Sequence, residues 1–182
     1  MHKNFCRIGP RTMAILPTFS KNGHPVSIVL EFGKSPCELE MKPRHVIDRT
    51  LRSYASSYVG AVQGAAYILK RNHTPPILIN AEKPIIMLPT WSSAKSDCAW
   101  FSLDHIAEFF EEEKGFTQVI LSGGENIKVP MSIQSFNHQF QKALFFRHQL
   151  DRADKLTSRA HEPKVTYHIF KGRGIRKSGK LE

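Results

Sequence analysis

Apolar positions near the start of the chain fall in two short runs that favour β-strands. Thr12–Phe19 and Pro25–Phe32 are separated by Ser20-Lys21-Asn22-Gly23, and Asn-Gly between two apolar runs is a strong hairpin signal. Glu38–Met41 continues the pattern as a third strand. The sequence therefore predicts that the chain opens with a β-hairpin.

The spacing of apolar positions becomes helical after Pro43, a residue that suits the first position of a helix. Five side chains recur at this spacing and predict one buried stripe: Val46, Ile47, Thr50, Leu51 and Tyr54. His45, Arg49 and Arg52 follow one another at intervals of four and three residues. We therefore expect their side chains to line up on another face of the same helix.

A second helix is predicted over Tyr58–Lys70, with Ser56 or Ser57 as its N-cap. Because this segment is almost entirely apolar, we expect it to lie in the core or at a subunit interface. Gly60 and Gly64 would let another backbone come close, either for tight packing within the chain or for a dimer contact.

Two buried strands are predicted after Pro75-Pro76, which ends the second helix. They cover Ile77–Asn80 and Pro84–Leu88, two short runs rich in apolar residues. A loop follows at Pro89-Thr90-Trp91-Ser92-Ser93.

A third helix is predicted to begin at Ser102, a suitable N-cap. Phe101 before it and Ile106 after it match the apolar pair that staples a helix start, and Asp104 suits the positive end of a helix. The acidic end of this helix holds Glu108 and Glu111–Glu113.

The last part of the chain predicts a second hairpin and a final helix. Phe116–Leu121 and Ile127–Met131 flank Ser122-Gly123-Gly124, and Ser132 suits the N-cap of the helix that follows. Met131 and Phe136 match another staple. We expect this helix to bury Ile133, Phe136, Phe140 and Leu144 and to expose Gln141, His148, Arg152, Lys155 and Arg159.

These elements together predict a single α/β (α+β) domain with a mixed or antiparallel sheet, hairpins and about four helices. Residues 1–170 form the domain, closed by a strand at Val165–Phe170, and residues 171–182 form a basic, flexible tail.

Charge is distributed in blocks along the chain, whose formal net charge is +10 with a pI near 9.7. Two basic regions flank an acidic one at residues 101–125. This pattern is typical of a protein with a cationic surface for a polyanion. The alternative interpretation is a basic surface that only keeps the protein soluble.

Candidate chemistry is sparse. Cys6, Cys37 and Cys98 form no CxxC pair, which argues against a disulfide framework or zinc ribbon and favours the cytosol. The nine histidines show no metal-binding spacing, and Cys98 with His105 lacks the third group of a catalytic triad. We therefore expect no enzyme, no metal, no cofactor, no signal peptide and no membrane span.

A nucleic-acid partner fits the basic helix better, because phosphate contacts need several cations on one surface. The candidate contacts are Arg44, His45, Arg49, Arg52, Lys70 and Arg71. A solvated helix face would give the same pattern. The sequence has no helix-turn-helix, zinc-finger or aromatic RNA-binding motif, so the expected mode of binding lies outside the common motifs.

A series of short motifs, in order, resembles the ComK family of competence transcription factors between about Thr12 and Phe146. The motifs are Met41-Lys42-Pro43, Asp48-Arg49-Thr50, Ser56-Ser57, Gly60, His73 to Pro76, Pro89-Thr90, Ser92-Ser93 and Cys98-Ala99-Trp100. Each motif alone is weak, and the series is specific.

This resemblance implies a cytoplasmic, nucleoid-associated activator that binds paired AT-rich boxes of double-stranded DNA, mainly through the minor groove. It also implies a homo-oligomer (dimer or tetramer) and control by a proteolytic adaptor, for which Val165–Phe170 is a candidate segment. Arg49 and Arg52 are the matched positions that we carry over as DNA contacts.

One departure from the family motivates an alternative function. Family members usually carry an arginine after Gly60, where this chain has Ala61-Val62. A divergent paralogue that acts through protein–protein interaction with a related regulator is therefore the alternative. A basic RNA-associated domain is a third hypothesis, based on charge alone.

Overall fold

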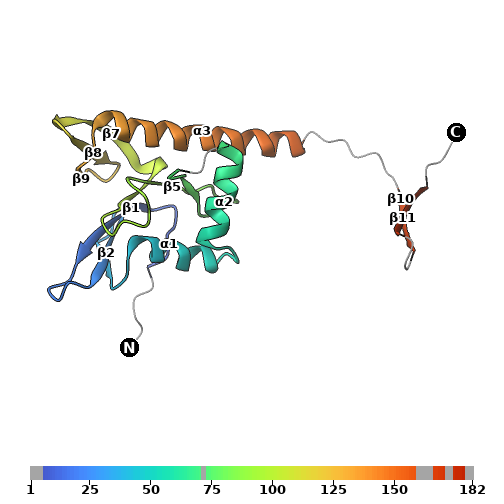
Figure 1. Cartoon of the computed structure of the whole chain (residues 1–182), viewed down its shortest axis with the longest axis horizontal. Coiled ribbons are helices and arrows are strands. Elements are labelled where there is room, and N and C mark those ends of the chain that lie inside the picture. The colour runs from blue at the N-terminus through green and yellow to red at the C-terminus, as the bar shows by residue number, and fades with distance from the viewer. Residues whose placement is uncertain (1–5, 71–72, 159–165, 171–173, 179–182) are drawn as a thin grey trace. The chain divides into compact units, whose positions relative to one another are not determined.

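The computed structural model describes residues 6–70, 73–158, 166–170 and 174–178. It divides into two compact units, Met1–Gln149 and Leu150–Glu182. The first unit holds two antiparallel sheets and the helices that cover them (Figure 1). The second holds the end of the last helix and one hairpin.

Six antiparallel strands form the larger sheet in the order β3-β2-β1-β6-β5-β4. Their bounds are β1 Thr12–Phe19, β2 Pro25–Glu31, β3 Cys37–Leu39, β4 Ile77–Leu78, β5 Ile86–Pro89 and β6 Trp100–Ser102. The predicted opening hairpin is confirmed: Phe19 pairs with Pro25, and Gly23 takes the left-handed conformation (φ +76°) that its turn requires.

Both faces of this sheet are buried, because helices cover one face and a helix with a second sheet covers the other. Neighbouring residues of β6 show the two sides. Trp100 meets the Tyr58 ring edge-on at 6.2 Å, whereas Phe101 meets the Phe136 ring edge-on at 5.8 Å. Trp100 and Phe101 are both fully buried. Tyr58 begins α2 (Tyr58–Leu69), Phe136 lies on α3 (Ile133–Ser158), and α1 (Pro43–Arg52) packs beside α2 (Figure 1).

Three strands form the smaller sheet in the order β7-β8-β9, with bounds β7 Ile106–Glu113, β8 Phe116–Leu121 and β9 Asn126–Val129. Phe109 of β7 lies 5.0 Å from the Phe136 ring and 5.2 Å from the Phe140 ring. This aromatic cluster attaches the start of α3 to both sheets. The predicted hairpin over Phe116–Leu121 and Ile127–Met131 is confirmed, with its second strand ending two residues earlier.

The prediction of a helix that begins at Ser102 is wrong. Only a 3₁₀ turn, Leu103–His105, follows Ser102, and the acidic segment is strand β7. Ile106, Phe109 and Phe110 have helical spacing in the sequence. Two register shifts, between Ile106 and Glu108 and between Glu111 and Glu113, break the alternation that would have revealed a strand.

The last helix begins as predicted, since the Ser135 N–H donates to Ser132 Oγ at 3.3 Å. Its buried face differs in part from the prediction. Phe136 is fully buried and Phe140 contacts Phe109, but Leu144 is 38% exposed. Ala143 and Phe146 are buried instead, which continues the stripe from Phe136 along the helix.

In the second unit, β10 (Thr166–Phe170) pairs with β11 (Gly174–Ser178) as an antiparallel hairpin. β10 coincides with the predicted closing strand, apart from Val165, which lies outside the described residues, as does Arg159. β11 falls in the segment assigned to the tail, and the division at residue 170 stays a prediction.

The α+β class with antiparallel sheets and hairpins is confirmed, with three α-helices in the described residues where about four were predicted. None of those helices is both long and apolar enough to cross a membrane.

Candidate nucleic-acid interface

α1 has one buried face and one cationic face, as its sequence predicts. Val46, Ile47 and Leu51 are buried against the six-stranded sheet. Thr50 is buried too, and its hydroxyl donates to the Val46 carbonyl and accepts the Ile8 N–H. These contacts fix the rotation of α1, so the opposite face must point to solvent.

Tyr54 departs from the predicted stripe, because α1 ends at Arg52. The Tyr54 side chain is exposed, and the Arg7 guanidinium lies 3.9 Å above the centre of its ring. No local sequence signal could have indicated this contact, because it joins residues 47 positions apart.

His45, Arg49 and Arg52 are exposed on α1. The Arg52 Nε donates to Asp48 Oδ2 at 2.8 Å, with the Arg52 side chain 73% exposed. The pair is therefore a surface ion pair that leaves most of the guanidinium in solvent. Arg49 and Arg52 also lie in the last turn of α1, where cations complement the negative end of a helix.

Arg44 lies at the opposite end of α1, in its first turn. Its guanidinium lies 4.7 Å from the centre of the Tyr58 ring, and the residue is half-buried. The arginine nearest the start of α1 is therefore held against α2, whereas Arg52 extends into solvent.

Lys70 is separate from the cations of α1. It ends α2 in the left-handed conformation (φ +52°), and the 12 residues of α2 place it roughly 18 Å along the axis from the start of that helix. Arg71 lies outside the described residues. Of the six predicted contacts, four lie on α1: His45, Arg49 and Arg52 are exposed, and Arg44 is held against Tyr58 of α2.

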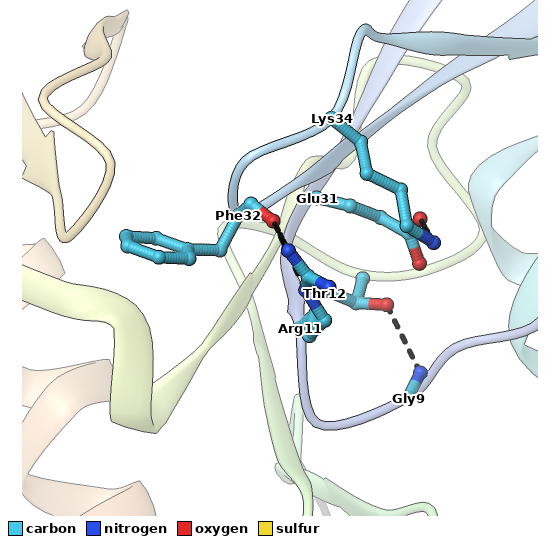
Figure 2. Close-up of polar contacts among 6 residues, drawn as sticks. All are labelled: Gly9, Arg11, Thr12, Glu31, Phe32 and Lys34. Atoms are coloured by element: carbon cyan, nitrogen blue, oxygen red, sulfur yellow. Dashed lines mark hydrogen bonds and ion pairs between the residues drawn. The ribbon is translucent and has the colours of Figure 1, made fainter.

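Two other exposed cations, Arg11 and Lys34, make contacts within the fold. Figure 2 shows that the Arg11 guanidinium donates two hydrogen bonds to the Phe32 carbonyl, at 3.1 Å from Nε and 2.9 Å from a terminal nitrogen. Lys34 pairs with Glu31 at 2.7 Å in the same turn. These two cations hold the end of the first hairpin.

α2 is largely exposed, so the prediction of a core helix is wrong for most of its surface. Tyr58, Ala65 and Leu69 are buried. Tyr67 is 86% and Val59 is 57% exposed. Gly60, Gln63 and Gly64 lie between them on the exposed side. The sequence also allowed α2 to lie at a subunit interface, and an exposed face with large apolar side chains agrees with that alternative.

Cys98 and His105 contact different residues. Cys98 is buried, and its Sγ lies 3.4 Å from the Trp91 carbonyl oxygen; burial raises the pKa of this thiol. His105 bonds to the Ser122 hydroxyl and the Pro10 carbonyl at 2.6 and 2.7 Å. Within the described residues, no group of three or more histidine, cysteine or acidic side chains could hold a metal ion.

Comparison with known proteins agrees with the motif series. The family model described as ComK protein matches residues 2–155. The chain is 30% identical over 164 residues to a protein of Bacillus subtilis (strain 168) described as competence transcription factor, an alignment that covers 84% of this chain and 85% of the relative. No solved structure matches.

Proposed function

The chain belongs to the ComK family, and on this premise we propose that it is a sequence-specific, DNA-binding transcription activator of competence genes. The observation that carries the DNA-binding part is the outward face of α1, where His45, Arg49 and Arg52 are exposed. Its place of action would be the nucleoid in the cytoplasm.

We propose that the target is AT-rich duplex DNA, read mainly through the minor groove. AT tracts have a narrow minor groove with a strongly negative potential, which favours arginine side chains. Ala61 and Val62 stand where the family usually carries arginine. Both are apolar and pack against the core, so this position supplies no cation. The arginines of α1 therefore provide the contacts in this chain.

Self-association would use the exposed face of α2. Tyr67 is a large side chain that is 86% exposed, and Gly60 and Gly64 would let a second helix approach closely. We expect Tyr67→Asp to shift the protein towards the monomer in sedimentation velocity while its circular dichroism spectrum is unchanged. An unchanged oligomer would overturn this choice of surface.

Regulation by a proteolytic adaptor, which the resemblance implies, remains a proposal for Val165–Phe170. Thr166–Phe170 is strand β10, so an adaptor would meet an extended segment. Deleting residues 166–178 should lengthen the half-life of the protein in a host that carries the adaptor. An unchanged half-life would exclude this segment.

The DNA proposal is tested by an electrophoretic mobility shift on an AT-box duplex, a GC-rich duplex and a structured RNA. We expect preferential binding to the AT-box duplex. If roughly six phosphates are neutralised, log affinity should fall against log salt with a slope of about −5. Equal binding to all three, or a flat salt response, would contradict the proposal.

The double variant Arg49→Ala/Arg52→Ala locates the interface. Two lost phosphate contacts should weaken binding about tenfold and reduce the salt slope by about 1.8. Lys21→Ala/Lys83→Ala removes the same charge from two exposed turns and is the matched control. Equal losses in both double variants would mean that only net charge matters.

A further inference from the structure

A pocket of about 410 Å³ opens where the first turns of α1 and α2 meet two loops. Its polar lining comes from Arg44, Gln63, Thr74, Ser92 and Ser93. Its apolar lining comes from Val59, Val62, Pro75 and Pro89, and Tyr58 completes the pocket. This volume falls within the range of small-ligand sites and exceeds what one water or ion needs.

Arg44 is oriented inside this pocket without being neutralised. Its guanidinium stacks on the Tyr58 ring at 4.7 Å, and among the described residues it has neither a hydrogen-bond acceptor nor an ion-pair partner. Asp48 contributes only a longer-range attraction. Stacking leaves the edge of the guanidinium, where its N–H donors point, available to a ligand.

Tyr58 is itself firmly held. It is buried, and its ring meets the fully buried Trp100 ring edge-on at 6.2 Å. The ring under Arg44 is thus fixed to the core. The arginine is therefore positioned before any ligand arrives, which lowers the ordering cost of binding.

Pro43 suits the start of α1, but the charges and the N-cap there are unfavourable for the helix, which indicates another role for Arg44. Lys42 occupies the N-cap without a side-chain hydrogen bond, and the first turn has no acidic residue. Lys42 and Arg44 instead place positive charge at the positive end of the helix dipole, where a cation is disfavoured. Departures from local rules of this kind concentrate at functional sites.

We propose that this pocket binds a phosphate ester, and that in the intact protein the ester is one linkage of the DNA backbone. The Arg44 guanidinium would donate hydrogen bonds to the phosphate oxygens, and the Ser92 and Ser93 hydroxyls would be further donors. The attached deoxyribose would lie against the apolar wall of Val59 and Val62. This inference rests on the proposed DNA-binding function and assigns Arg44 a role distinct from that of the exposed Arg49 and Arg52.

The N-terminus of α2 adds little to this site. Its Tyr58 N–H already donates to Asp48 Oδ1, and its Gly60 N–H donates to Ser57 Oγ. The Asp48 carboxylate also offsets the positive end of the α2 dipole. The attraction for an anion therefore depends on Arg44, and one substitution should remove it.

The test compares three variants on the AT-box duplex at fixed salt. Arg44→Ala should lose about 10- to 100-fold in affinity, as expected for a charge-assisted bond. Lys42→Ala removes the same charge two residues away, outside the pocket lining, and should lose at most about fivefold. Val62→Phe fills the pocket without changing charge and should also weaken binding, with folding checked by thermal melting.

Single methylphosphonate linkages in the duplex then identify the contact. At one position, the neutral linkage should weaken wild-type binding as much as Arg44→Ala does and should not weaken the Arg44→Ala variant further. If the wild type binds the duplex and neither Arg44→Ala nor Val62→Phe weakens that binding, the assignment of the pocket to DNA is wrong and the proposed function stands. Absence of wild-type binding would instead overturn the proposed function.

A free nucleotide is the other source of a phosphate ester. Titration with deoxyadenosine monophosphate and with inorganic phosphate, followed by the fluorescence of the tryptophans, separates the two sources. We expect no saturation by either at millimolar concentration. Saturable nucleotide binding that requires Arg44, with duplex binding unaffected by Arg44→Ala, would overturn the assignment to the DNA backbone.

Discussion

The Asp48 carboxylate joins the two helices of the candidate interface: its Oδ1 accepts the backbone N–H of Tyr58 at 2.9 Å. Its other oxygen accepts from Arg52. One side chain on α1 therefore satisfies an amide in the first turn of α2, which has no partner within its own helix. The relative position of α1 and α2 depends on this contact, and so does the position of Tyr58 under Arg44.

Replacing Asp48 with Ala should lower the free energy of unfolding by about 1–2 kcal/mol, because a capping acceptor of a backbone amide is lost. Asp48→Asn retains an oxygen for the Tyr58 N–H and loses the ion pair, so it should cost less than about 1 kcal/mol. Urea denaturation followed by circular dichroism measures both. Equal losses would show that the charge, and not the amide contact, connects the helices.

Acid should remove the charge-dependent part of this stabilisation. The Tyr58 N–H and then the Arg52 guanidinium hold the pKa of Asp48 below its usual value. A carboxyl group with a lowered pKa stabilises the fold above its unfolded pKa, near 3.9, and that stability is lost as the pH falls through the lower folded value. The gap in unfolding free energy between wild type and Asp48→Asn should therefore be constant from about pH 7 to 5 and narrow below about pH 4. If the difference in unfolding free energy stayed constant down to pH 2, the lowered pKa of Asp48 would be contradicted.

Two substitutions on α3 separate the observed buried face from the predicted one. Phe136→Ala should cost about 3–5 kcal/mol, because it leaves a cavity among Phe101, Phe109 and Phe140. Leu144→Ala should cost less than about 1 kcal/mol, since Leu144 is 38% exposed. Thermal and urea denaturation measure the free energy of unfolding of both variants. Comparable losses would mean that Leu144 is buried too, and that α3 is rotated about its axis relative to the structure.

Cys6 should react slowly with iodoacetamide in the folded protein. Burial, and then the neighbouring Cys37 thiol, raise the pKa of Cys6 to about 12. Only the thiolate reacts, so alkylation at pH 8 should be at least about tenfold slower than in urea. Peptide mass spectrometry over time measures the rate for each cysteine. Similar rates with and without urea would show that the segment around Cys6 is open to solvent.

The elements that the sequence predicted well have local signals. Asn22-Gly23 sets the first turn, Pro43 opens α1, and Ser57 caps α2 through the Gly60 N–H. The cationic face of α1 follows from helical spacing alone. The ion pair of Arg52 with Asp48 also has the four-residue separation that favours such pairs.

The features that the sequence missed depend on contacts between distant segments. The apolar spacing of β7 resembles that of a helix, because bulges that form only against β8 break the alternation of a strand. The stacking of Arg7 on Tyr54, and of Arg44 on Tyr58, needs segments that only the fold brings together. The pocket beside Arg44 joins two helices and two loops, and no spacing along the chain indicates it.

The acidic strand β7 lies at one end of the smaller sheet, as the described residues show it. An outer strand has backbone groups that can pair with a second molecule, and such pairing nucleates aggregates. Glu108 and Glu111–Glu113 are exposed along this strand. Lys128 pairs with Glu112 and Glu113 within the chain, so Glu108 and Glu111 are the carboxylates that two copies meeting edge to edge would bring together. Their repulsion would oppose such pairing of β7 with a second molecule.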